Sequence, residues 1–179
     1  MEQIQLTHAE LIDPDDKAIC QDQKHRTDNE ALYTLRRLTE EEIPAALSLA
    51  WEVFSEYESP VYSKEGTEEF RRCLHDETYL AGITYYGAFD AETLIGEISI
   101  RTRQRHICFF FVKGSYHRRG IGTKLFQRLL REDPKGPITL NASPYGLPFY
   151  QALGFRPMDK EQTVNGIRFT PMEYRTNVD

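Results

Sequence analysis

The order of apolar and polar positions predicts alternating strands and helices after the first thirty residues. Helical spacing of apolar residues is clearest in residues 120–131, and the run CFFFV at residues 108–112 is typical of a strand that is buried on both faces. The turn Asn165-Gly166 suits a hairpin, so one more strand is expected before it. The other expected strands are residues 32–38, 85–89, 94–101, 106–112, 138–141 and 168–174, and the expected helices are residues 39–54, 67–75, 120–131 and 145–153.

The start of the first helix has two interpretations. Thr39 followed by Glu42 has the form of a capping box, which would begin the helix at Thr39. Pro44 conflicts with that start unless it lies in the first turn, or unless the regular helix begins there.

Length and composition favour one globular domain. The chain has 179 residues, of which 40% are hydrophobic and 28% charged. It has no apolar stretch of about 18 residues that could cross a membrane, and its first residues lack the basic start and apolar run of a secretory signal. We therefore expect a cytoplasmic protein with an acidic extension at residues 1–30 and a domain at residues 31–179.

Charge is unevenly distributed along the chain. The formal net charge is -6, and residues 1–30 contain eight acidic and three basic residues. Residues 98–131 contain nine basic residues and no acidic one. Solvated faces of strands and helices explain such a segment, and so does a local positive field that attracts a polyanionic ligand. Nucleic-acid binding is the weaker hypothesis, because the whole chain is acidic and the basic segment includes apolar core positions.

The cysteines point to reduced thiols. Cys20, Cys73 and Cys108 are odd in number and show no CxxC or Cys/His spacing. This pattern favours an intracellular protein without a metal site.

The most informative local feature is YHRRGIGTKLFQRLL at residues 116–130, where a strand gives way to a helix. The first N–H groups of a helix have no internal partner, and the helix dipole adds positive charge there. Gly120 and Gly122 have no Cβ atom, so an anion can approach their amides, while Arg118 and Arg119 add charge at the rim. A phosphate or pyrophosphate is the expected ligand, although glycines that only shape a tight turn explain the same pattern.

Two other phosphate-binding patterns do not fit this junction. A P-loop requires GxxxxGK[ST], but Arg119 stands five residues after Gly114, where that pattern needs a second glycine. The dinucleotide pattern GxGxxG fails because Leu125 stands at its third glycine, and no acidic residue follows at a strand end about twenty residues on.

Residues 117–122 (HRRGIG) resemble the [Q/R]xxGx[G/A] acetyl-CoA motif of the GNAT superfamily of N-acetyltransferases, and residues 149–155 (FYQALGF) resemble its second signature, a helix that ends in Yxx(x)GF. The order of elements is also similar, and the segments HICFFFV, NASPYGLPFYQALGF and NGIRFTPM resemble a set of bacterial acetyltransferase-like proteins of undefined substrate. Two positions depart from the family pattern. His117 replaces Gln or Arg, and Ser143 stands where many members have Asn, with Asn141 two residues earlier.

The resemblance implies an α+β (α/β) GNAT acyl-CoA N-acyltransferase fold, whose mixed, mostly antiparallel sheet of about seven strands is flanked by four helices and splayed at a central gap. It implies acetyl-CoA as co-substrate and no metal, with the pantetheine arm lying in the gap. The amide of Val112 is expected to polarise the thioester carbonyl, and Ser143 and Tyr150 are expected to lie along the arm. The residues expected to cradle the pyrophosphate are Arg118, Arg119, Gly120, Ile121, Gly122 and Thr123.

The implied reaction is direct attack by an amine in a ternary complex. Tyr150 is the expected general acid to the departing thiolate, and packing beside the arm is its alternative role. Glu97 and His106 are both candidates for the general base, and for each a solvated or structural role is the alternative.

Two functions from different classes follow from the sequence. The leading hypothesis is acetyl transfer from acetyl-CoA to a primary amine on a small molecule or peptide. The alternative is a non-catalytic acyl-CoA-binding sensor or regulatory module. The fold does not choose the acceptor. No nucleic-acid or membrane partner is expected, and a homodimer is compatible with the resemblance because dimers are common in the family.

Overall fold

The structure is a computed structural model in which residues 33–132, 134 and 136–175 are described. The chain divides into two compact units, Met1–Tyr33 and Thr34–Asp179, and apart from Tyr33 every described residue belongs to the second. The predicted extension at residues 1–30, including Cys20, lies outside the described residues, and its boundary stays a prediction.

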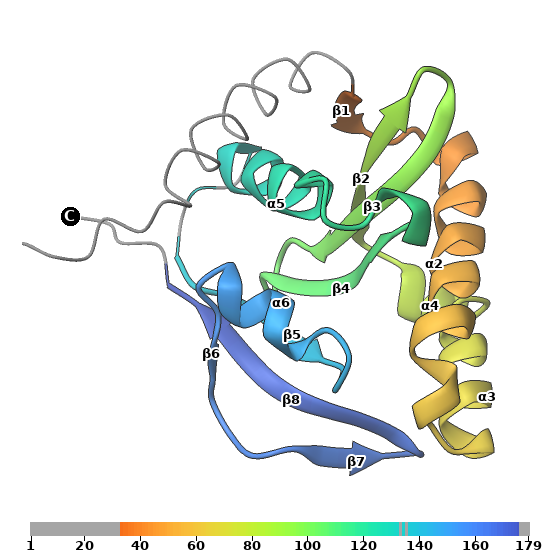
Figure 1. The fold of residues 1–179 in the computed structure, drawn as a ribbon, viewed down its shortest axis with the longest axis vertical. Helices are drawn as coiled ribbons and strands as arrows, with labels where there is room; N and C mark the ends of the chain where they lie inside the picture. The colour runs from red at the N-terminus through yellow and green to blue at the C-terminus, as the bar shows by residue number, and fades with distance from the viewer. Residues whose placement is uncertain (1–32, 133, 135, 176–179) are drawn as a thin grey trace, which may run out of the picture. The chain divides into compact units, whose positions relative to one another are not determined.

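In the described part of the chain, eight strands form the sheet, in the order β1-β2-β3-β4-β5-β8-β6, with β7 paired to β8 (Figure 1). The strands are β1 (Tyr33–Arg37), β2 (Ile83–Asp90), β3 (Thr93–Arg101), β4 (His106–Val112), β5 (Ile138–Ala142), β6 (Arg156–Pro157), β7 (Gln162–Val164) and β8 (Ile167–Tyr174). β4 and β5 run parallel, whereas β2 with β3, β3 with β4, and β8 with each of its partners run antiparallel. The predicted fold class and mostly antiparallel sheet are confirmed.

Helices flank the sheet on both faces (Figure 1). The described α-helices are α2 (Ile43–Tyr57), α3 (Lys64–Cys73), α4 (Glu77–Leu80), α5 (Ile121–Glu132) and α6 (Leu147–Ala152), with short 3-10 turns η1 (Glu40–Glu42), η2 (Ser59–Val61) and η3 (Gly114–Tyr116). The part of the chain that is described therefore has five α-helices where four were expected. The addition is α4, whose four residues are too few to show a helical period.

Both interpretations of the first helix start are correct in part. The capping box of Thr39 and Glu42 is present, but it caps the short turn η1. The regular helix α2 begins at Ile43, which puts Pro44 in its first turn, where a missing N–H costs no hydrogen bond.

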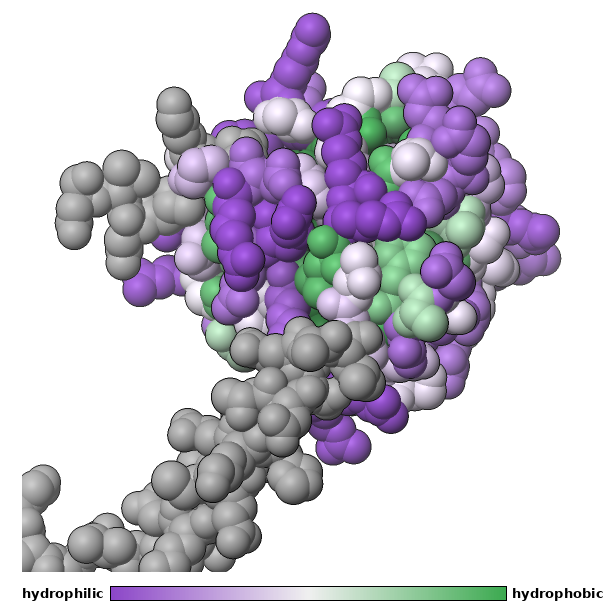
Figure 2. Space-filling model, turned by 90° about the horizontal axis from the view of Figure 1, so that it is seen from above, coloured by the Kyte–Doolittle hydropathy of each residue, from purple (hydrophilic) through white to green (hydrophobic). Residues whose placement is uncertain are grey.

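The sheet is covered on both faces by different helices. On one face, buried Ala50 and Phe54 of α2 pack in a cluster with Tyr85, Phe109 and Phe111. On the other face, the buried residues of α5 are Ile121, Leu125, Phe126 and Leu129. Large apolar side chains that stay exposed are scattered, and the face in Figure 2 shows hydrophilic side chains around smaller apolar areas.

The sheet opens between β4 and β5. These strands pair at only two positions, His106 with Thr139 and Ile107 with Leu140. The register between β3 and β4 shifts at the same level, because Ser99 pairs with Phe109 while its neighbour Ile100 pairs with Ile107. Cys108 is thus the extra residue of a β-bulge, which bends a strand and disrupts pairing. We attribute the separation of β4 from β5 after Ile107 to this bulge.

Candidate functional site

The turn before α5 presents amides that have no partner inside the helix. Arg118 has φ +59° and Gly120 has φ +77°, so the chain reverses sharply before the helix begins at Ile121. The first helical hydrogen bond runs from the amide of Lys124 to the carbonyl oxygen of Gly120 at 3.0 Å. The amides of Ile121, Gly122 and Thr123 therefore precede the first bond of the helix. The predicted cradle residues do form one helix start.

Gly120 and Gly122 are each required for a different structural reason. At position 120 the positive φ favours glycine, whereas space does not limit the side chain, because a Cβ there would meet nothing within 4 Å. A Cβ at Gly122 would lie 2.7 Å from Cζ of Phe149 on α6. Gly122 thus lets α6 pack against the start of α5. Turn geometry explains Gly120, and packing against Phe149 explains Gly122.

His117 ties the turn to the end of β4. Its Nε2 atom lies 2.7 Å from the carbonyl oxygen of Val112, to which it donates a hydrogen bond. The imidazole also lies beside the Tyr57 ring, at 4.9 Å between ring centroids. Although His117 differs from the Gln or Arg of the family motif, it is still a hydrogen-bond donor. Its hydrogen bond holds the turn to the end of β4.

Amides of β4 point into the gap. The amide of Lys113 bonds to the carbonyl oxygen of Ile95 on β3 at 2.9 Å. Alternate amides of a strand point to opposite sides, so those of Val112 and Phe110 face away from β3, toward the opening beside β5. Val112 was expected at this position from the sequence, and Phe110 is a second donor of the same kind.

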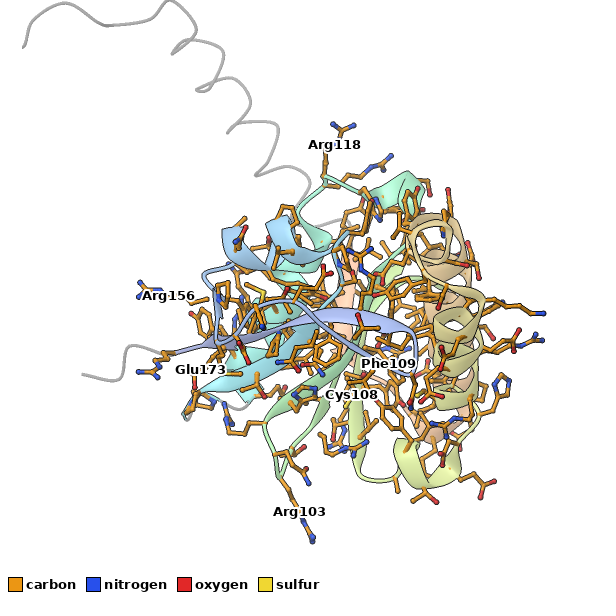
Figure 3. The ribbon with its side chains drawn as sticks, turned by 90° about the horizontal axis from the view of Figure 1, so that it is seen from below. Arg103, Cys108, Phe109, Arg118, Arg156 and Glu173 are labelled. Atoms are coloured by element: carbon orange, nitrogen blue, oxygen red, sulfur yellow. The ribbon has the colours of Figure 1, made fainter. Side chains whose placement is uncertain are left out.

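A cavity of about 370 Å³ extends from this gap to α3 and the β7–β8 hairpin. Tyr150, Ser143 and Asn141 line it from α6 and β5, and Glu58 lines it from the end of α2. Figure 3 shows Cys108 and Phe109, which also line the cavity, in the interior of the fold, whereas Arg118 projects outward from the turn. The part of this cavity that lies beside α3 and the β7–β8 hairpin is called the chamber.

Tyr150 stays protonated in this setting. Burial raises the pKa of Tyr150 above its ordinary value, and the neighbouring Glu58 carboxylate raises it further. Its ring packs against Phe110 at 6.0 Å between centroids, and its carbonyl oxygen accepts the amide of Phe155 at 3.0 Å. A phenol held in this way can donate a proton but does not lose one to water at neutral pH.

Glu58 is the residue that the sequence did not reveal. Burial raises the pKa of Glu58 to about 7, although a hydrogen bond with the Ser143 side chain opposes the rise. Its amide bonds to the carbonyl oxygen of Phe54 at 2.9 Å, which fixes its backbone at the end of α2. A carboxyl group that titrates near neutrality beside a protonated phenol is suited to take up a proton.

Glu97 lies outside the cavity, whereas His106 lines it at the level where β4 and β5 are still paired. Glu97 has 0% exposure, does not line the cavity, and has no hydrogen-bond partner among the described residues for either carboxylate oxygen. Burial raises its pKa well above the ordinary value. His106 lines the cavity, but it lies where β4 and β5 are still paired, and its Nδ1 is 2.9 Å from Oγ1 of Thr139. Burial lowers the pKa of His106. Glu58 is therefore a third candidate for the base, beside the two that the sequence indicated.

Part of the basic segment is neutralised locally. Lys113 pairs with Glu52 at 3.8 Å, and Arg128 pairs with Glu132 at 2.6 Å. Arg118 and Arg119 are exposed at the turn before α5, where Arg119 stacks on the Tyr116 ring at 5.0 Å. Arg118 thus places a positive charge at the turn that precedes the helix.

The described residues lack what a metal site and a membrane-spanning helix require. Within the described ranges, no group of three or more His, Cys, Asp or Glu side chains could hold a metal ion. No helix in that part of the chain combines the length and apolar character needed to cross a membrane.

Comparison with known proteins decides the family. Residues 58–176 match the sequence family described as "Acetyltransferase (GNAT) domain". The chain belongs to the GNAT acetyltransferase family. Membership of the GNAT family supports transfer of an acyl group from an acyl-CoA donor. No curated protein sequence matched the chain.

Solved structures share the GNAT fold at low sequence identity. A GCN5-related N-acetyltransferase from Rhodopseudomonas palustris has a TM-score of 0.66 at 21% identity, over 79% of this chain and 94% of that one. The PaiA N-acetyltransferase from Thermoplasma acidophilum, solved with coenzyme A, has a TM-score of 0.63 at 22% identity, over 80% and 98%. An aminoglycoside 6'-N-acetyltransferase complexed with coenzyme A has a TM-score of 0.57 at 14% identity, over 82% and 98%.

Proposed function

We propose that this GNAT protein transfers an acetyl group from acetyl-CoA to a primary amine by direct attack, with Glu58 as general base and Tyr150 as general acid. The observation that carries the proposal is that both side chains line one cavity, which begins at the gap between β4 and β5. A carboxyl with a pKa of about 7 and a phenol that keeps its proton supply the two proton transfers that the reaction needs.

The residues that would hold the donor fit an acyl-CoA. A pyrophosphate is suited to the amides of Ile121, Gly122 and Thr123, with Arg118 and Arg119 at the rim. A pantetheine arm requires an opening in the sheet with apolar walls and strand amides, which β4 provides after Ile107. When bound, acetyl-CoA supplies an activated acyl group. The amides of Val112 and Phe110 are the donors placed to polarise its carbonyl.

The protein groups then act in sequence. Glu58 accepts a proton from the attacking amine, and Ser143 lines the same cavity. Tyr150 donates its proton to the departing thiolate and recovers one from solvent. Each transfer uses a side chain that already borders the cavity, so no covalent enzyme intermediate is required.

The alternative is an acyl-CoA-binding sensor without catalysis. The helix start and the gap alone would serve such a sensor. The presence of Glu58 and Tyr150 in the same cavity favours the enzyme, because binding alone does not require a base and an acid beside each other.

A thiol-release assay tests the proposal. The full chain is incubated with acetyl-CoA and a panel of primary amines while free CoA thiol is measured, and acetyl-CoA binding is followed by calorimetry in parallel. We expect amine-dependent thiol release that falls about 100-fold in Tyr150→Phe, within the range for loss of a general acid. Tight acetyl-CoA binding with no release for any amine would favour the sensor.

A further inference from the structure

Aromatic residues are numerous in the lining of the chamber beside the gap. Nine of the described residues that line the cavity are aromatic, and most of these belong to α2, α3, β4 and β8. Phe54 and Phe70 stack at 3.9 Å between centroids, and Phe70 meets Phe109 edge to face at 6.1 Å. Among the described residues, no lysine or arginine lines the cavity. A ligand in this chamber therefore meets apolar surface and finds no cation there for a carboxylate or phosphate.

The chamber offers one carboxylate to a cationic ligand. Glu58 and Glu69 are the acidic residues in its described lining. Glu69 accepts two hydrogen bonds from Arg72, at 2.7 and 2.9 Å, and one from Nδ2 of Asn165 at 3.2 Å. These bonds, with Arg72 first, hold the pKa of Glu69 down to about 2, so its charge is already matched. Glu58 is left as the partner for a single amino group.

The β7–β8 hairpin borders the chamber, and its tip lies beside α3 (Figure 1). A Cβ at Gly66 of α3 would lie 2.2 Å from the carbonyl oxygen of Gly166 in the hairpin turn. Near the same corner, the Tyr62 hydroxyl donates to the carbonyl oxygen of Arg168 at 2.7 Å. Asn165 and Gly166, with φ +50° and +76°, form the predicted hairpin turn.

The available volume is small. The cavity of about 370 Å³ must hold the acyl end of the donor as well as the acceptor. Pockets of about 300–1,000 Å³ bury small organic ligands. Residues of the β7–β8 hairpin bound this space on one side, which leaves little room for a long peptide chain.

We propose that the acceptor is a small primary monoamine with an apolar or aromatic arm, and that the chamber discriminates against acceptors with a carboxylate, a second amine or a long peptide chain. This inference rests on the proposed function, since it names the amine that Glu58 would deprotonate. The arm lies among the rings of α3 and β4, and the amino group lies at Glu58.

Matched amines test the inference. Thiol release with acetyl-CoA is measured for phenethylamine against phenylalanine, which differ by a carboxylate, and for hexylamine against 1,6-diaminohexane, which differ by a second amine. A short peptide with a free N-terminus is the third comparison. We expect kcat/KM for each monoamine to exceed that of its partner, and that of the peptide, by at least about tenfold, the discrimination that about 1.4 kcal/mol provides. Preference for the amino acid, the diamine or the peptide would overturn the inference.

A charge placed in the chamber gives an independent test. Val164 of β7 lines the cavity and is 54% exposed, so a longer side chain can be accommodated. Val164→Lys is expected to shift the ratio of phenylalanine to phenethylamine turnover at least about fivefold toward phenylalanine. Thr163→Lys, one residue away on an exposed position that does not line the cavity, is the matched control and is expected to leave the ratio unchanged. A ratio that moves equally in both variants would contradict the inference.

Failure of the proposed function gives a different result. If acetyl-CoA binds but no amine in the panel releases thiol, the enzyme hypothesis fails, and the acceptor inference fails with it. If thiol is released with the opposite selectivity, the enzyme hypothesis stands and only the acceptor inference is wrong.

Discussion

The imidazole Nε2 of His117 lies 2.7 Å from the carbonyl oxygen of Val112, so the first residue of the glycine motif is bonded to the last residue of β4. This bond joins the helix start that would hold a pyrophosphate to the strand whose amides would hold the acyl arm. His117, which departs from the family motif, therefore connects the start of α5 to the end of β4.

We predict that His117→Ala weakens donor binding because the turn is no longer fixed to β4. The KM for acetyl-CoA is expected to rise about three- to tenfold with kcat little changed, consistent with loss of one hydrogen bond of about 1 kcal/mol. His117→Gln keeps a donor and is expected to recover most of the effect. His75→Ala, an exposed histidine bonded to Arg71, is the control. Equal KM values for the His117→Ala variant and the wild type would refute this role.

Tyr150→Phe separates the acid from its packing role. The ring stays against Phe110, but the proton is lost. We expect kcat to fall about 100-fold while the calorimetric Kd for acetyl-CoA changes less than about twofold. Tyr145→Phe, at a position that is 48% exposed, serves as the control. If the Kd rises and kcat does not fall, Tyr150 holds the donor and is not the acid.

The raised pKa of Glu58 predicts a pH dependence of kcat/KM. The pKa is raised to about 7, and a base acts in its ionised form, so kcat/KM is expected to increase as pH rises through about 7. Glu58→Gln is expected to remove this inflection and to lower kcat/KM at pH 8 by about 100-fold. Glu56→Gln, two residues earlier and exposed, is the control. An inflection that persists in Glu58→Gln would assign the titration to another group.

The raised pKa of the buried Glu97 predicts that the stability of the fold depends on pH. The raised pKa means that the folded state holds a proton that the unfolded chain releases, so stability is expected to fall as pH rises above the ordinary carboxyl pKa. Glu97→Gln cannot ionise and is expected to be more stable than the wild type at pH 8, because the wild-type carboxyl must keep a proton that the unfolded chain releases at that pH. Near pH 4 the two proteins are expected to be alike. Urea unfolding at both pH values measures this, with exposed Glu68→Gln as control. A loss of stability at pH 8 would mean that the carboxylate has a partner.

Much of the fold could be predicted because its signals are local. The apolar period of α5 and the Asn165-Gly166 turn depend on neighbouring residues, and both appear where the sequence indicates. The strands β6 and β7 have two and three residues, which is too short for an alternating pattern. The hairpin turn nevertheless indicated β7 before it, whereas β6 forms through pairing with β8, which no local rule describes.

The site was only partly predictable, because some of its residues come together only through contacts between distant parts of the chain. The cradle residues are consecutive, so one motif contains them. Glu58 acquires its raised pKa from burial in a cavity whose other wall is Tyr150, far along the chain. Glu97 follows Gly96 and precedes Ile98 in a pattern that suits a half-exposed strand, but α2 covers the second face of the sheet and buries it. Tertiary packing therefore buries Glu97 away from the cavity and places Glu58 in its lining, which local sequence patterns do not indicate.

The most direct test of the account is a calorimetric titration of the full chain with CoA and with pantetheine, at two temperatures so that a zero enthalpy is not mistaken for no binding. The amides at the start of α5 can hold only a ligand that carries the pyrophosphate. We predict that CoA binds at least about tenfold more tightly than pantetheine, a difference of about 1.4 kcal/mol. Equal affinities, or no binding of CoA to the folded protein, would contradict the account.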